Sequence, residues 1–81
     1  MNYAEYFASI AYKPKYFLGD RVFGYFNKVP FIGSVGNDRR ISEVEGPTIT
    51  IHLDLPMKVD NVVRNVIVCK HKDIKSRLVQ F

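Results

Sequence analysis

The chain has a single cysteine, no tryptophan and no long hydrophobic run. Because Cys69 stands alone, an intrachain disulfide is excluded, and a reducing cytoplasmic setting is the natural expectation. No apolar stretch approaches the roughly 18 residues that span a bilayer. The first twelve residues carry Glu5 and no early lysine or arginine, which argues against a signal peptide. We therefore expect a soluble chain with no membrane partner.

A length of 81 residues allows one small hydrophobic core but no two-lobed enzyme with a cleft between lobes. Hydrophobic residues make up 47% of the chain and charged residues 25%, which excludes disordered and low-complexity classes. The formal net charge is +4, so an anionic partner is allowed without being required.

The N-terminal segment has helical periodicity. Tyr3, Tyr6, Phe7 and Ile10 share one face at spacings of three and four residues, and Pro14 ends any helix that precedes it. We therefore divide the chain into an N-terminal helix or extension, residues 1–15, and a β domain, residues 16–81.

The β domain shows short runs of strand-forming residues separated by turn residues. The clearest run alternates four apolar residues with polar ones from Thr48 to Leu55, which indicates a half-buried strand that Pro56 closes. The turns are expected at 27–28, 36–38 and 60–61, and one helical turn at 72–75. The other strands are expected at Arg21–Phe26, Phe31–Val35, Ile41–Val44, Val62–Lys70 and Leu78–Val79. This spacing predicts a mainly β fold: a small, closed or half-closed SH3-like barrel of about five strands with a short N-terminal helix.

Two stretches carry a family resemblance. Gly19-Asp20-Arg21-Val22, followed by Gly33-Ser34-Val35, resembles the opening hairpin of KOW and Tudor-like SH3-type barrels. The ending, from Lys70-His71-Lys72-Asp73-Ile74 to Leu78, is similar to their last strand, single turn and closing strand. The resemblance covers the architecture from Gly19 to Val79. The chain also looks like short proteins of tailed phages, which would place it in the host cytoplasm.

The residues that carry enzyme chemistry are sparse. Cys69 and His71 could form a nucleophile and base, but no orienting third group accompanies them. With His52 they supply three potential metal ligands, fewer than the four of a structural zinc site, and no phosphate-binding glycine loop is present. We expect no enzyme, no catalytic residue, no metal, no cofactor and no small-molecule substrate.

Basic residues gather at the predicted turns. Groups of this kind make salt-sensitive contacts with phosphates, and a nearby aromatic ring can stack on a base. Tyr25 is the best stacking candidate, because it should lie on the face opposite Val22 and Phe26. The leading hypothesis is a non-enzymatic module that contacts nucleic acid, or a nucleic-acid-handling complex. The residues expected to contact phosphate are Arg39, Arg40, Lys70, Lys72, Lys75 and Arg77.

Ten of the eleven aromatic residues lie between positions 3 and 31, more than one small barrel needs. Tyrosine and phenylalanine are common anchors of protein interfaces. The alternative hypothesis is therefore a protein adaptor or inhibitor, homo-oligomeric or phage-encoded, that docks through Tyr3, Tyr6, Phe7 and Ile10. A plainer interpretation has the N-terminal helix folding back to plug its own barrel.

Overall fold

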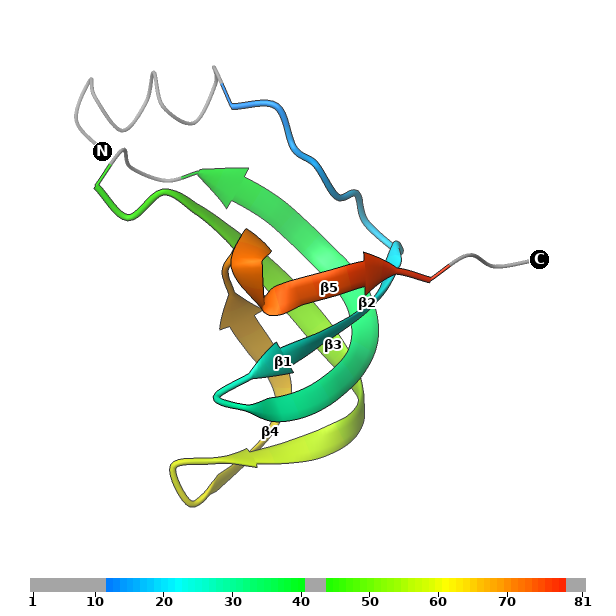
Figure 1. Cartoon of the computed structure of the whole chain (residues 1–81), viewed down its shortest axis with the longest axis vertical. Coiled ribbons are helices and arrows are strands. Elements are labelled where there is room, and N and C mark those ends of the chain that lie inside the picture. Colours follow the sequence, from blue (N-terminus) through cyan, green and yellow to red (C-terminus); the bar gives the residue numbers. More distant parts are fainter. Residues whose placement is uncertain (1–11, 41–43, 79–81) are drawn as a thin grey trace.

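The computed structural model describes residues 12–40 and 44–78. They form a five-stranded antiparallel sheet of order β4-β3-β2-β1-β5 (Figure 1). The elements in chain order are β1 (Arg21–Phe26), β2 (Val29–Arg40), β3 (Pro47–Val59), β4 (Val62–Cys69), the 3₁₀ turn η1 (His71–Asp73) and β5 (Ile74–Arg77). The prediction of a mainly β fold with about five strands is confirmed. The predicted N-terminal helix falls on residues 1–11, outside the described residues.

The sheet bends strongly but does not close. β4 and β5 are its two edges, and no strand pairing joins them. The long strands β2 and β3 curve around η1, which contacts both β1 and β3 (Figure 1). Register shifts between Val35 and Asn37 and between His52 and Met57 produce this bending, because a bulge kinks a strand and increases its twist.

The core lies on the concave side of the sheet. The fully buried side chains there come from three strands and occupy inward-facing positions: Val22 in β1, Val35 in β2, and Ile49 and Ile51 in β3. The predicted alternation of β3 holds through Ile51 and Leu53 but fails at Leu55, which is 80% exposed. The cause is the register shift after His52, which moves the following side chains to other faces.

Three predicted boundaries differ most from the structure. β2 runs through the predicted turn at Gly36–Asp38 as far as Arg40, because a bulge absorbs the glycine there. Pro56 lies inside β3, in the stretch where the pairing is irregular and a missing N–H costs little. The last described strand is Ile74–Arg77 and ends before Leu78, where the closing strand is predicted to begin, since the helical turn ends at Asp73; Val79 lies outside the described residues.

Two hairpins have two-residue turns, at Asn27–Lys28 and Asp60–Asn61, as predicted. All four residues have positive φ, from 49° to 66°, which is typical of type I′ turns. Asparagine and aspartate tolerate this conformation, but lysine is not favoured there.

Lys28 therefore provides a test of the turn. We expect Lys28→Gly to raise the free energy of unfolding by about 0.5 kcal/mol, because glycine adopts φ 66° without strain. Lys28→Val should lower it by more than about 1 kcal/mol, because a β-branched residue is strained at this φ. Urea denaturation followed by circular dichroism measures both. Equal stabilities for the two variants would contradict the turn assignment.

Candidate nucleic-acid interface

A buried carboxylate organises one end of the sheet. The Asp38 side chain, near the end of β2, has no exposed surface. Its Oδ2 accepts hydrogen bonds from the backbone N–H groups of Lys15 (2.8 Å) and Tyr16 (2.9 Å). Its Oδ1 accepts one from the Tyr12 hydroxyl (2.6 Å) and lies 3.0 Å from His71 Nε2. Asp38 thus ties the segment before β1 to β2 and η1.

The electrostatics of this cluster favour the ionised carboxylate. Burial raises the pKa of Asp38, but the hydrogen bonds from Tyr12, Tyr16, His71 and Lys15 outweigh it and hold that pKa below its ordinary value. Burial, together with the bond to the Asp38 carboxylate, raises the pKa of the Tyr12 hydroxyl well above its ordinary value. At neutral pH, Asp38 is therefore an anion and Tyr12 a neutral donor.

The buried ring of Tyr16 joins the same segment to β5. Arg77 lies over this ring, 5.1 Å from its centroid, and donates a hydrogen bond to the Lys15 carbonyl (2.7 Å). Arg77 also pairs with Asp20 at 3.2 Å, and the Lys15 ammonium lies 5.5 Å from the Tyr16 centroid. These contacts hold the N-terminal arm (residues 12–20) against β5, and they place its lysines beside the basic residues of the C-terminal strands.

The strand register and η1 bring the remaining basic groups to the same end: Lys72 lies in η1, whose His71 contacts Asp38, and the Lys75 ammonium donates a hydrogen bond to the Lys72 carbonyl. Asp38, Ile49 and Cys69 form one row across β2, β3 and β4. One residue further along, Arg39 lies opposite Thr48, and Lys70 follows Cys69 next to them. We call the resulting surface the basic end. It contains eight of the twelve lysine and arginine residues of the chain: Lys13, Lys15, Arg39, Arg40, Lys70, Lys72, Lys75 and Arg77.

All six predicted phosphate contacts lie at the basic end, but they differ in availability. Arg77 is held by Asp20 and Lys15, and the ammonium groups of Lys70 and Lys75 donate to the carbonyls of Glu45 and Lys72. Within the described part of the chain, the side chains of Arg39 and Lys72 are exposed and have no ion-pair or hydrogen-bond partner. These two are the best placed to contact an incoming anion.

Two parts of this surface are not among the predicted phosphate contacts, although Lys13 and Lys15 are visible in the sequence as a basic pair around Pro14. The first is Lys13 and Lys15, which only the fold of the N-terminal arm brings to the basic end; Lys13 is exposed and has no ion-pair or hydrogen-bond partner among the described residues. The second is Asp38, which lies in what reads as an exposed turn. A polar residue in a Gly-Asn-Asp stretch gives no sign that a bulge will bury it.

Tyr25 lies where the period-two pattern predicts. It is 43% exposed on the outer face, away from the buried Val22, and packs edge-on against Phe23 with ring centroids 5.4 Å apart. Its neighbour Gly24 lies directly against the Asp73 backbone of η1, but the strand register places Tyr25 opposite Pro30, at the end of β2 farther from Arg39 and Arg40. The predicted protein-interface residues Tyr3, Tyr6, Phe7 and Ile10 lie outside the described residues, and that prediction stays open.

Cys69 does not have the properties of a nucleophile. Its side chain is buried, and burial together with the charge of Asp73 raises the pKa of the thiol to about 12. Such a thiol is protonated at neutral pH and reacts slowly. His71 is held by Asp38 and Tyr12 rather than by Cys69. In residues 12–40 and 44–78, no three histidine, cysteine or acidic side chains gather as metal ligands do, and no helix has the length and hydrophobicity of a membrane span.

Searches of protein-family models, of curated proteins and of solved structures found no match to this chain.

Proposed function

We propose that this chain is a non-enzymatic module that binds nucleic acid through the basic end, built on a half-open sheet related to SH3-type barrels. One observation supports the proposal above all: eight cationic side chains share this surface with only four described carboxylates, which are Asp20, Asp38, Glu45 and Asp73. Among the four carboxylates, Asp38 is buried among hydrogen-bond donors and Asp73 caps η1, so neither reaches a ligand readily. The field over this end is therefore positive, which attracts a polyanion.

The state of the aromatic rings suggests how the ligand is held. Tyr12 and Tyr16 belong to the Asp38 cluster, and their rings are not free to stack on bases. Contacts at the basic end are therefore mainly with backbone phosphates, which carry no sequence information. Tyr25 is 43% exposed on the outer face of β1, opposite Pro30, where it offers a stacking site for a base of a single strand that extends beyond the basic end.

Fluorescence anisotropy with short duplex and single-stranded DNA and RNA oligonucleotides tests the proposal. Four to five phosphate contacts should lower the affinity by roughly 100-fold between about 50 and 200 mM salt. Arg39→Glu and Lys72→Glu should each weaken binding and reduce the salt slope by about one. Arg64→Glu makes the same charge change at the other end of the sheet and should leave both unchanged. Absence of binding at about 50 mM salt would overturn the proposal.

Tyr25→Ala separates the two kinds of contact. We expect it to weaken single-strand binding by about 1–3 kcal/mol while leaving duplex binding near the wild-type value, because only an unpaired base can stack on the ring. Loss of duplex binding as well would contradict this role of Tyr25.

A further inference from the structure

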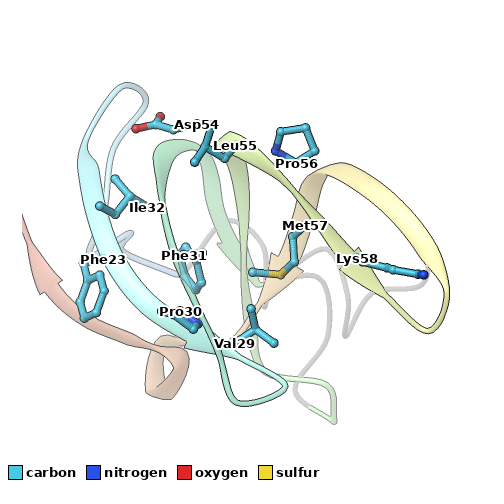
Figure 2. A pocket seen from close by; sticks show the side chains of 10 residues that line it. All are labelled: Phe23, Val29, Pro30, Phe31, Ile32, Asp54, Leu55, Pro56, Met57 and Lys58. Carbon is cyan, nitrogen blue, oxygen red and sulfur yellow. The ribbon is translucent and has the colours of Figure 1, made fainter.

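The sheet splits at the end opposite the basic end. The pairing of β2 with β3 stops at Gly33 and Leu53, and β3 then turns away and pairs only with β4 from Met57 onward. The first four residues of β2, Val29–Ile32, therefore pair with β1 alone. An apolar groove with a volume of about 720 Å³ lies between this part of β2 and the departing part of β3 (Figure 2).

The groove has a buried floor and an exposed hydrophobic rim. Phe31 and Met57 form the floor and are 5% and 6% exposed. The rim carries Leu55, which is 80% exposed, and Ile32, which is 43% exposed. Figure 2 shows Leu55 and Pro56 on one side of the opening and Ile32 with Phe23 on the other. Large apolar side chains grouped around a cavity of this size are typical of a binding site.

Pro30 determines how a ligand could be held. It lies in the part of β2 that has no partner on the β3 side, which explains why a proline is tolerated in this strand. Because Pro30 lacks an N–H group, this edge is a poor template for an added strand. A ligand in the groove is therefore recognised mainly through its side chains, by burial of apolar groups against Phe31, Met57 and Leu55.

The charges around the groove select the chemistry of the occupant. Lys58 lines the groove, Lys28 precedes the lining residue Val29, and Arg64 lies opposite the lining residue Met57 on β4; all three are exposed. Asp54 already forms a bidentate ion pair with Arg21, which keeps the pKa of the Asp54 carboxyl below its ordinary value. Asp60, at the tip of the β3–β4 hairpin, is the other nearby acid. The rim is thus cationic, and it complements an acidic ligand.

We propose that this groove binds a segment of another protein that presents one or two large apolar side chains flanked by aspartate or glutamate. A second copy of the chain fits this description poorly. Of its six described carboxylates, Asp38 is buried, Asp20 and Asp54 are paired with arginines, and Asp73 caps η1, which leaves only Glu45 and Asp60 in exposed turns. The groove and the basic end lie at opposite ends of β2 and β3, whose course Figure 1 shows. A protein and a polyanion can therefore bind the chain at the same time.

Selection from a random displayed-peptide library against the full chain tests the proposal. We expect enriched sequences to combine leucine or phenylalanine with aspartate or glutamate. In anisotropy measurements with an enriched peptide, Leu55→Asp and Ile32→Asp should each weaken binding by about tenfold or more. Val68→Asp is the matched control, because Val68 is 57% exposed on β4, outside the groove. It should leave the affinity unchanged, and thermal melts should show all three variants folded.

The charge requirement is tested with the same peptide. Lys58→Glu should weaken its binding several-fold at low salt, and replacing its acidic residues by lysine should abolish binding. No enrichment, enrichment of neutral or basic sequences, or equal losses in the Val68→Asp control would overturn the proposal. A dimer in light scattering that Leu55→Asp converts to a monomer would overturn it in favour of a second copy. Loss of oligonucleotide binding in Leu55→Asp would assign the groove to nucleic acid instead. That conclusion would hold whether or not the Arg39→Glu and Lys72→Glu variants also lose oligonucleotide binding.

Discussion

Replacing Gly24 by alanine is expected to destabilise the fold by about 3 kcal/mol or more, the largest effect of any single methyl group in this chain. A Cβ at this position would overlap the backbone carbonyl oxygen of Asp73 and lie 2.9 Å from Phe31 Cζ and 3.0 Å from the Asp73 carbonyl carbon. The clash is with backbone, so no rotamer change relieves it. The turn η1 would have to move off β1, and Ile74 would leave the core with it.

Gly36→Ala is the matched control. A Cβ there would meet the ring of His52, at 2.6 Å from Nε2, but His52 is exposed and can rotate away. We expect a change within about 1 kcal/mol for this variant. Urea denaturation of both variants, followed by circular dichroism, gives the comparison. Gly24→Ala with wild-type stability would show that η1 does not pack on β1 as described.

The local pattern of the sequence predicts the sheet but not its bending. Alternation from Thr48 to Ile51 and the turn residues at 27–28 and 60–61 are local signals, and the strands they predict are present. Bulges at Val35–Asn37 and His52–Met57 come from packing between strands distant in sequence. They extend β2 and β3 beyond their expected ends, and a period-two pattern contains no information about them.

The same limit applies to the candidate sites. The basic residues are identifiable because charge is visible in the sequence, but their common surface depends on the register of β2, β3 and β4 and on the contacts of the N-terminal arm and η1 with Asp38. The groove could not be predicted, because it exists only where β3 separates from β2. The sequence contains one signal of it, because Pro30 and Pro56 lie in the parts of β2 and β3 that no longer pair with each other. Prolines in long strands therefore mark places to search for an opening.

Removing the Asp38 carboxylate has the second largest expected effect. Asp38→Ala leaves the N–H groups of Lys15 and Tyr16 without their acceptor and creates a void beside His71. We expect a loss of about 2–4 kcal/mol at neutral pH. Asp38→Asn keeps an acceptor of the same shape and should lose about half as much. Hydrogen exchange should show the Lys15 and Tyr16 amides losing protection first, before the amides of β2 and β3.

The pH dependence separates the charge of Asp38 from its shape. The pKa of Asp38 is lower in the folded chain than its ordinary value of 3.8, so the folded state binds this proton less tightly than the unfolded state does. Its contribution to stability is therefore complete above the unfolded pKa and is lost as the pH falls through the folded pKa. The stability of the wild type should decline more steeply on acidification than that of Asp38→Asn, and the two curves should converge at low pH.

Asp60→Asn is the control for this comparison, because Asp60 is exposed in a turn whose φ of 50° suits asparagine equally well. At neutral pH its stability should lie within about 0.5 kcal/mol of the wild-type value. Parallel curves for the wild type and Asp38→Asn would show that hydrogen-bond geometry, and not ionisation, holds the N-terminal arm. In that case the arm should stay in place at low pH, and acid should leave the alignment of Lys13 and Lys15 with the rest of the basic end unchanged.

If ionisation of Asp38 does hold the N-terminal arm, acid should release the arm. Oligonucleotide affinity should then fall over the same pH range in which Asp38 takes up its proton.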